Sequence, residues 1–218
     1  MYRIVKKETL NPSVNLYEIE APMTAKTAQP GQFVILRSHK DGERIPITIH
    51  DCDREKGTVT IIVQTVGAAT ERLRHMEQGE FLEDFVGPLG RPTEIEGNKK
   101  VCVIGGGVGC AIAYPVLKKF HDCGAEVHAI AGFRNRDMVI LEEKFRSVSD
   151  LFRLCTDDGS YGEKGLVTDA LRDLLGKGHF YDQVIAIGPL VMMKFVALTT
   201  EEYGIPTTVS MNPIMVDG

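Results

Sequence analysis

Up to about residue 97, apolar and polar residues alternate along the chain, which is typical of strands with one buried face. Turn-forming pairs such as Asn11-Pro12, Pro30-Gly31 and Lys56-Gly57 separate the alternating segments. The pattern therefore predicts an antiparallel β-barrel or β-sandwich. Its expected strands cover residues 2–9, 13–19, 32–38, 45–51 and 58–66, with a short helix over 69–76 and a tight turn over 87–92.

After this region, short apolar runs alternate with longer stretches of helical periodicity. Such alternation indicates βαβ units and a parallel sheet covered by helices on both faces. The expected strands cover residues 100–104, 126–131, 151–155 and 183–187, and the expected helices start at Val108 or cover 139–146, 168–175 and 191–203. Glu96-Gly97-Asn98 has the composition of a connection, so the sequence predicts a β-barrel domain over 1–97 and an α/β domain over 98–218.

The composition narrows the class of protein. With 25 Lys and Arg against 30 Asp and Glu, the 218-residue chain has a net charge of −5, which disfavours nucleic acid as a partner. Neither a signal peptide nor a run of about 20 apolar residues is present, so no export and no membrane span are expected. The five cysteines never form a CxxC pair, so we expect no metal site in this chain and a reducing, cytoplasmic location.

The strongest chemical signal is the segment VCVIGGGVGCA at residues 101–111, where a buried strand runs through four glycines into a helix. Glycines let the backbone approach a pyrophosphate, and free N–H groups at a helix start attract anions. The match to GxGxxG is imperfect, because Cys110 occupies the third glycine position counted from Gly105. The next strand also ends without the acidic residue that holds an adenosine ribose. A tight strand-to-helix turn without a ligand is the alternative interpretation.

Two barrel segments carry weaker signals. The segment RIPIT, from Arg44 to Thr48, places a cation, a proline and a hydroxyl on one strand, and its alternative interpretation is a solvated face. The segment Gly67-Ala68-Ala69-Thr70 offers N–H groups and a hydroxyl to a phosphate, and its alternative is an ordinary helix cap. Together with GPLGRP at 87–92, these segments predict a ligand cleft between the two halves.

The order of these motifs resembles the ferredoxin reductase superfamily, over essentially the whole chain. The strings ERIPITI, GPLGRP, CTDDGSYGEKGLVT, IGPLVMMK and VSMNPIMVDG are most similar to the small subunit of NADH-dependent ferredoxin:NADP oxidoreductase, also called the sulfide dehydrogenase beta-type subunit. The dihydroorotate dehydrogenase electron-transfer subunit is a near relative. The resemblance implies a flavin-dependent NAD(P)H oxidoreductase subunit that takes hydride from NADH to FAD and passes electrons to a larger flavoprotein or iron–sulfur subunit, and possibly to ferredoxin.

The resemblance also assigns cofactor-binding residues. FAD would be held by Arg44, Ile45, Pro46, Ile47, Thr48, Val63, Gln64, Thr65, Gly67, Ala69 and Thr70. The dinucleotide, NAD(H) or NADP(H), would be held by Gly107, Val108, Gly109, Arg134, Thr156, Asp157, Gly188, Pro189 and Met192. No catalytic side chain is expected, because hydride passes directly between the two stacked rings.

The chain departs from the family pattern in three ways. Arg44 stands one residue early relative to the RxxS spacing, which would reverse its face on a strand. Ile187 occupies the position where many members have a cysteine. The family usually continues into a cysteine cluster that holds a 2Fe–2S centre, whereas this sequence stops at Gly218 without those cysteines.

Two other functions stay open at this stage. The chain could be a non-catalytic module that binds a dinucleotide as a redox sensor or scaffold. An ordinary NAD dehydrogenase is disfavoured, because the barrel half offers no catalytic His or Tyr–Lys pair. For the nucleotide, Arg134 and Arg136 favour the 2′-phosphate of NADPH, whereas Asp157 and Asp158 oppose it. The resemblance favours NADH, which is our prediction.

Overall fold

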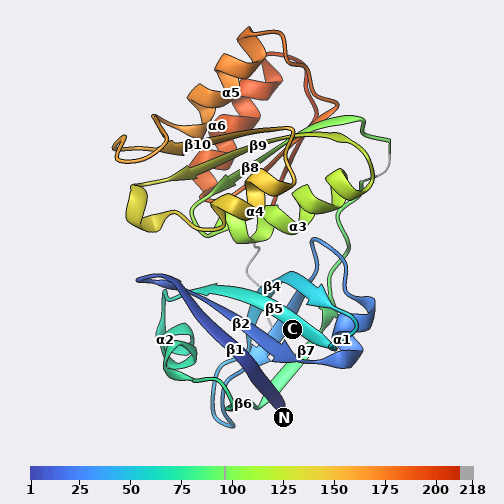
Figure 1. The fold of residues 1–218 in the computed structure, drawn as a ribbon, viewed down its shortest axis with the longest axis vertical. Coiled ribbons are helices and arrows are strands. Elements are labelled where there is room, and N and C mark those ends of the chain that lie inside the picture. The colour runs from blue at the N-terminus through green and yellow to red at the C-terminus, as the bar shows by residue number, and fades with distance from the viewer. Residues whose placement is uncertain (96, 212–218) are drawn as a thin grey trace. The chain divides into compact units, whose positions relative to one another are not determined.

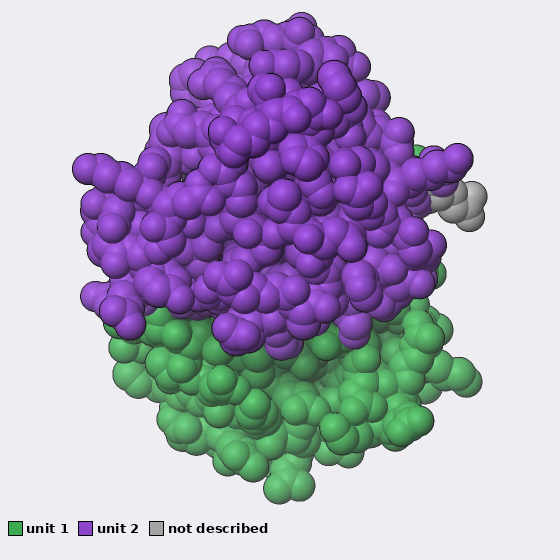
Figure 2. Space-filling model, turned by 45° about the horizontal axis from the view of Figure 1, so that its top comes forward, with its two compact units in different colours: residues 1–94, 218 green, residues 95–217 purple. Residues whose placement is uncertain are grey.

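The computed structural model describes residues 1–95 and 97–211, and it divides the chain into two compact units (Figure 2). One unit is Met1–Glu94 and the other begins at Ile95, whereas the sequence places the boundary after Gly97. Glu96 of the predicted connection and residues 212–218 of the predicted second domain lie outside the described residues.

The first unit is an antiparallel, nearly closed barrel. Its strands are β1 (Tyr2–Asn11), β2 (Val14–Glu20), β3 (Phe33–Arg37), β4 (Ile45–Asp53), β5 (Thr58–Gln64), β6 (Phe81–Leu82) and β7 (Asp84–Leu89). They lie in the order β6-β1-β2-β5-β4-β3-β7, so the two ends of the sheet come from consecutive segments of the chain. Alternate residues such as Tyr17, Leu36, Ile61 and Phe85 fill the interior, as the period of two predicts.

Three barrel segments differ from the prediction, and one of them is the two-residue strand β6, which was not expected. A short helix, α1 (Pro22–Thr27), lies between β2 and β3 and was not expected. The predicted turn at 87–92 is wrong in its first half, because β7 continues through Gly87 and Pro88 to Leu89. Proline removes one ladder donor, and β7 tolerates it because the strand lies at an edge of the sheet.

The second unit contains a parallel sheet of six strands. They are β8 (Lys100–Gly106), β9 (Glu126–Phe133), β10 (Leu151–Thr156), β11 (Glu163–Lys164), β12 (Gln183–Ile187) and β13 (Thr207–Val209). The order β11-β10-β9-β8-β12-β13 means that the chain moves outward from β8 on one side and then returns to its other side. The point where the direction reverses lies between β8 and β12, and ligands of open α/β sheets bind at the carboxyl ends of the strands at such a point.

Helices cover both faces of this sheet, as predicted. They are α3 (Gly109–Asp122), α4 (Glu142–Ser147), α5 (Val167–Gly176) and α6 (Leu190–Glu201), with a 3₁₀ turn, η1, at Arg136–Met138. Figure 1 shows α3 and α4 on one face and α5 and α6 on the other. Within residues 1–95 and 97–211, no helix is long and apolar enough to span a membrane.

A cluster of titratable side chains lies at the amino-terminal end of this sheet. The buried ring of His128 forms hydrogen bonds to the hydroxyl of Tyr181 (2.9 Å) and to Oε1 of Glu126 (3.1 Å), and Lys100 pairs with the same carboxylate at 2.6 Å. His179 contacts the His128 ring edge-on, with 4.9 Å between ring centroids. Burial, together with the charge of Lys100, holds the pKa of His128 below its ordinary value.

We expect this histidine to make the second unit less stable in mild acid. The unfolded chain takes up a proton near the ordinary histidine pKa of about 6.5, whereas the folded chain does so only at lower pH. The contribution of His128 to the unfolding free energy is therefore fully present above a pH of about 6.5. It decreases as the pH falls from there toward the lower pKa of the folded chain. His128→Gln should show a smaller loss of unfolding free energy between pH 7 and pH 5 in urea titrations.

His121→Gln is the matched control, because His121 lies half-exposed near the end of α3. An equally steep pH dependence in His128→Gln and in the parent would contradict the assignment.

Candidate functional site

A pocket of about 540 Å³ opens at the carboxyl edge of the parallel sheet, next to the point where the strand order reverses. The ends of β8, β9, β10 and β12 contribute to it, together with the first turns of α5 and α6. Its lining residues are Gly106, Gly107, Gly132, Phe133, Arg134, Asp157, Leu166, Val167, Thr168, Asp169, Arg172, Pro189, Val191, Met192 and Phe195. Apolar walls with a few charged groups are typical of a pocket for a small organic ligand.

The pocket brings together part of the predicted dinucleotide set. Gly107, Arg134, Asp157, Pro189 and Met192 line it, whereas Val108, Gly109, Thr156 and Gly188 do not. Thr156 is fully buried, and its hydroxyl donates to the carbonyl of Tyr161 at 2.6 Å. Its side chain therefore shapes the loop after β10.

The glycines of this edge serve two different purposes. A Cβ on Gly109 would lie 2.4 Å from the carbonyl oxygen of Ile187, and one on Gly106 would lie 2.4 Å from Sδ of Met192. These two glycines let the start of α3 and the start of α6 approach the sheet closely. Gly107 differs, because a Cβ there would meet no atom within 4 Å and its φ is +55°. Gly107 therefore presents open backbone to the pocket.

The sequence analysis missed one wall of the pocket. The residues Leu166 to Asp169 form the start of α5, and Arg172 lies one turn further along that helix. Phe195 of α6 adds an aromatic ring that is 50% exposed. The motif GEKGLVTD, at residues 162–169, is the sequence signal that marks this wall.

Of the charges weighed for nucleotide preference, the pocket includes Arg134 and Asp157 but not Arg136 and Asp158. The guanidinium of Arg136 lies over the ring of Tyr161, 5.5 Å from its centroid. The carboxylate of Asp158 accepts hydrogen bonds from the backbone N–H and the hydroxyl of Ser160. Arg136 and Asp158 therefore contact residues of the loop after β10 and do not line the pocket.

The predicted FAD strand has two faces. Ile45 and Ile47 pack against the barrel core, whereas Pro46, between them, is exposed. The strand alternation places Thr48 on the face of Pro46. Arg44 precedes β4, and its guanidinium forms a 3.1 Å ion pair with Asp84 of β7.

The neighbouring strand and helix start complete the predicted FAD set. Val63 is buried in the core, while Gln64 and Thr65 are half-buried at the end of β5. The next helix, α2 (Ala68–His75), begins after Gly67, where an added Cβ would meet no atom within 4 Å. This helix start, including the half-buried Ala69, is therefore open to a ligand.

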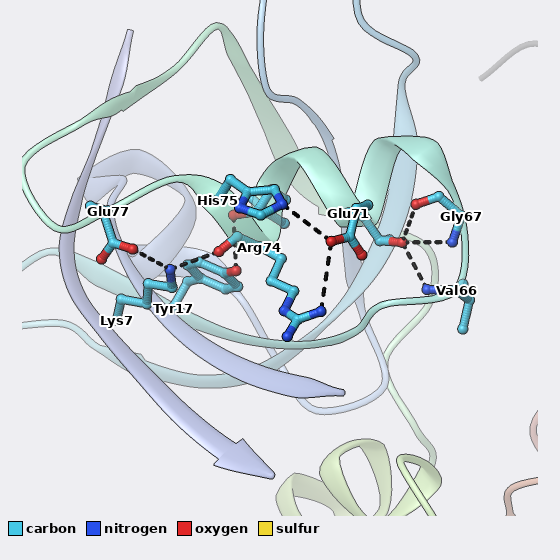
Figure 3. A network of polar contacts seen from close by, with 10 residues as sticks. Lys7, Tyr17, Val66, Gly67, Glu71, Arg74, His75 and Glu77 are labelled. Atoms are coloured by element: carbon cyan, nitrogen blue, oxygen red, sulfur yellow. Dashed lines mark hydrogen bonds and ion pairs between the residues drawn. The ribbon is translucent and has the colours of Figure 1, made fainter. Parts of the chain in front are cut away.

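The Thr70 hydroxyl closes the first turn of α2. It accepts hydrogen bonds from the backbone N–H groups of Val66 (2.9 Å) and Gly67 (3.0 Å) and donates to the carbonyl of Gly67 at 2.9 Å (Figure 3). These bonds use the one donor and both acceptor positions of a hydroxyl. Thr70 therefore shapes the loop that leads into the helix, and the backbone N–H groups of the first turn are left to meet an anion.

Side chains from β1 and β2 hold the other end of α2 (Figure 3). The hydroxyl of the buried Tyr17 donates to the carbonyl of Leu73 at 3.0 Å, and the ammonium of Lys7 donates to the carbonyl of Arg74 at 2.7 Å. Lys7 also pairs with Glu77 at 2.7 Å. Burial raises the pKa of Tyr17 to about 12, so its donor proton is retained at neutral pH.

The two buried cysteines nearest the glycine segment offer little nucleophilic chemistry. Burial raises the pKa of Cys102 and of Cys110 to about 12, so both stay protonated at neutral pH. Within the described part of the chain, no group of three or more His, Cys, Asp and Glu side chains could hold a metal ion.

Gly109→Ala should destabilise the second unit through a clash within the protein. The added Cβ would meet the backbone at Ile187 and Gly188, and such overpacking costs roughly 1–3 kcal/mol. Urea unfolding measures this loss. Gly176→Ala is the control, because a Cβ there meets no atom within 4 Å, and equal stability of the two variants would contradict the packing role.

Thr70→Ala should destabilise the first unit by about 1–2 kcal/mol, because the variant loses the capping bonds at the start of α2. Thr70→Ser keeps the hydroxyl and should recover most of that loss. If the alanine variant unfolds at the same urea concentration as the serine variant, the hydroxyl does not cap the helix.

Comparison with known proteins places this geometry in a family. No family model matches the chain. The chain is 50% identical over 226 residues to a Clostridium beijerinckii protein described as an uncharacterized protein in the adh 3′ region, and the match covers 100% of this chain and 76% of the relative. It is 44% identical over 215 residues to a Thermotoga maritima homologue of the electron transfer subunit of dihydroorotate dehydrogenase B (NAD(+)), with 99% of this chain and 76% of the relative covered.

Solved structures agree with this result. An NADH-dependent reduced ferredoxin-NADP oxidoreductase, studied for flavin-based electron bifurcation, matches with a TM-score of 0.93 and 41% identity over 100% of this chain and 78% of the other. The ferredoxin reductase of carbazole 1,9a-dioxygenase shares the fold alone, with a TM-score of 0.78 and 16% identity over 95% of this chain and 67% of the other. The predicted barrel followed by a parallel sheet is thus confirmed as a ferredoxin-reductase-like fold, and the chain belongs to the family of dihydroorotate dehydrogenase B electron transfer subunits and their homologues.

Proposed function

We propose that this chain is an electron-transfer subunit that binds FAD on its first unit and NADH on its second, and that passes electrons to a partner subunit. The observation that carries the proposal is the pocket at the carboxyl edge of the parallel sheet. Its position, its apolar walls and its open glycine suit a dinucleotide. The two relatives named for NAD(+) or NADH support the same cofactor.

The residues of the second unit fit the nucleotide in distinct ways. Gly107 lets a pyrophosphate approach the backbone, because no atom fills the space beside it. Asp157 lines the pocket and can accept hydrogen bonds from ribose hydroxyls. The same carboxylate would repel a 2′-phosphate, which is why we propose NADH over NADPH. Met192 and Pro189 supply an apolar wall.

The residues of the first unit fit FAD through two segments, the strand β4 with the end of β5, and the start of α2. Pro46, Thr48 and the half-buried end of β5 offer a face to the flavin, and the start of α2 at Gly67 offers N–H groups to its phosphates. Thr70 acts on this site by fixing the helix start. Arg44 is engaged by Asp84, so a phosphate would have to compete with that carboxylate.

The two bound cofactors would supply the redox chemistry, in which hydride arrives from the nicotinamide and electrons leave one at a time. The protein therefore needs no acid–base pair, and its residues bind and orient the two rings. The relatives named as electron transfer subunits support a larger partner subunit as the acceptor. Dihydroorotate dehydrogenase and a ferredoxin-linked flavoprotein are the two partner classes that the relatives suggest, and a cytoplasmic location stays a prediction.

A rapid-mixing experiment tests the function. The purified protein, reconstituted with FAD, is mixed without oxygen with NADH or NADPH, and the loss of flavin absorbance is followed. Steady-state assays with an artificial electron acceptor then compare the two nucleotides.

We expect kcat/KM to favour NADH several-fold or more, which corresponds to at least about 1 kcal/mol. Asp157→Asn should reduce this preference for NADH over NADPH. Asp158→Asn is the matched control, because Ser160 already engages that carboxylate.

Two results would contradict the proposal. Equal use of NADPH by the parent would show that arginine, rather than Asp157, controls the preference. A protein that takes up no flavin but still binds NADH would support the non-catalytic sensor or scaffold instead.

A further inference from the structure

Arg172 is an arginine without an assigned role that lines the nucleotide-sized pocket. It lies on α5, outside the segments from which the dinucleotide residues were predicted. An exposed arginine on a helix ordinarily pairs with a carboxylate three or four residues away or with a neighbour. Arg172 can form such a pair only if a nearby carboxylate has no other partner.

The two carboxylates of α5 nearest to Arg172 in sequence are occupied elsewhere. Asp169 accepts a hydrogen bond from the backbone N–H of Leu166 at 2.9 Å and so caps its own helix. Asp173 accepts from the guanidinium of Arg153 at 2.5 Å and from the ammonium of Lys177 at 2.8 Å. Within residues 1–95 and 97–211, Arg172 has no ion-pair partner.

A second arginine that lines the same pocket also lacks an ion pair within the described residues. Arg134 extends from the end of β9, and the described residues offer it no ion pair either. Two guanidinium groups from different elements thus line one cavity, together with Asp157 and with Asp169, whose carboxylate caps α5. The planar guanidinium matches two oxygens of a phosphate group, which makes arginine a preferred phosphate-binding residue.

We propose that Arg172, together with Arg134, binds the 5′-phosphate in the adenosine half of the nucleotide. This inference rests on the proposed function, because it assigns a phosphate contact within the same NADH pocket. Its ligand class is an adenosine 5′-phosphate. The apolar neighbours Leu166 and Phe195, which are 55% and 50% exposed, offer a surface for the base.

Calorimetric titration of the full chain with 5′-AMP tests the proposal without any flavin reaction. Arg172→Gln should weaken 5′-AMP binding about tenfold, which is about 1.4 kcal/mol, and should leave adenosine binding unchanged. Arg172→Lys should recover only part of the loss, because an ammonium cannot make the two parallel bonds. Arg146→Gln is the matched control, since Arg146 pairs with Glu142 on α4 and lies outside the pocket.

Titration with 2′-AMP separates the two possible phosphate positions. Selective loss of 2′-AMP binding in Arg172→Gln would overturn the assignment to the 5′-phosphate. Unchanged 5′-AMP binding in that variant, with normal NADH reactivity of the parent, would overturn the inference alone. If the parent binds neither 5′-AMP nor NADH, both the inference and the proposed function fail.

Discussion

The close approach of three backbone segments at the carboxyl edge of the parallel sheet is the constraint on which the second unit depends. The end of β8, the start of α3 and the end of β12 meet where Gly106, Gly109 and Gly188 stand, and a Cβ on any of them would lie within 3 Å of a neighbouring atom. Because these contacts are internal, they fix the positions of α3 and α6 before any ligand arrives. The pocket is the space that this packing leaves open beside Gly107.

In the first unit, hydrogen bonds fix both ends of α2, the helix for which we propose a ligand role. The α2 segment is short, and isolated helices of this length are marginal in water. Its first turn is closed by Thr70, and its last carbonyls accept hydrogen bonds from Tyr17 and Lys7. The helix start can therefore stay fixed although Gly67 itself is exposed, and a fixed set of N–H groups binds an anion at a lower entropic cost.

The sequence predicted the fold well because the two units obey different periodicities. The period of two places alternate residues of β5, namely Val59, Ile61 and Val63, in the barrel core, and helical periodicity persists through α5. The prediction failed at β7 because proline and glycine ordinarily interrupt strands, and whether a strand lies at a sheet edge is a property of the whole topology. The short helix α1 was missed because a helix of one or two turns leaves too little periodicity to detect.

The candidate site was only partly predictable, and the glycines show why. The four glycines at the end of β8 and the start of α3 suggested a phosphate site, with Gly107 and Gly109 assigned to the dinucleotide. Gly107 is open and Gly109 is packed against Ile187, and only contacts across the sheet separate a packing glycine from an open one. The wall formed by α5 was missed for a similar reason, since Arg172 is distant in sequence from the glycine motif.

The ion pairs of nearby carboxylates also decide which arginines can bind a ligand. An arginine can bind a ligand only when the surrounding carboxylates pair with other cations, and Asp173 pairs with Arg153 and Lys177. Arg136 and Arg134 are separated by one residue, but the first is held over Tyr161 while the second lines the pocket. The recognition chemistry of the pocket is thus set by the ion pairs around it as much as by the residues that line it.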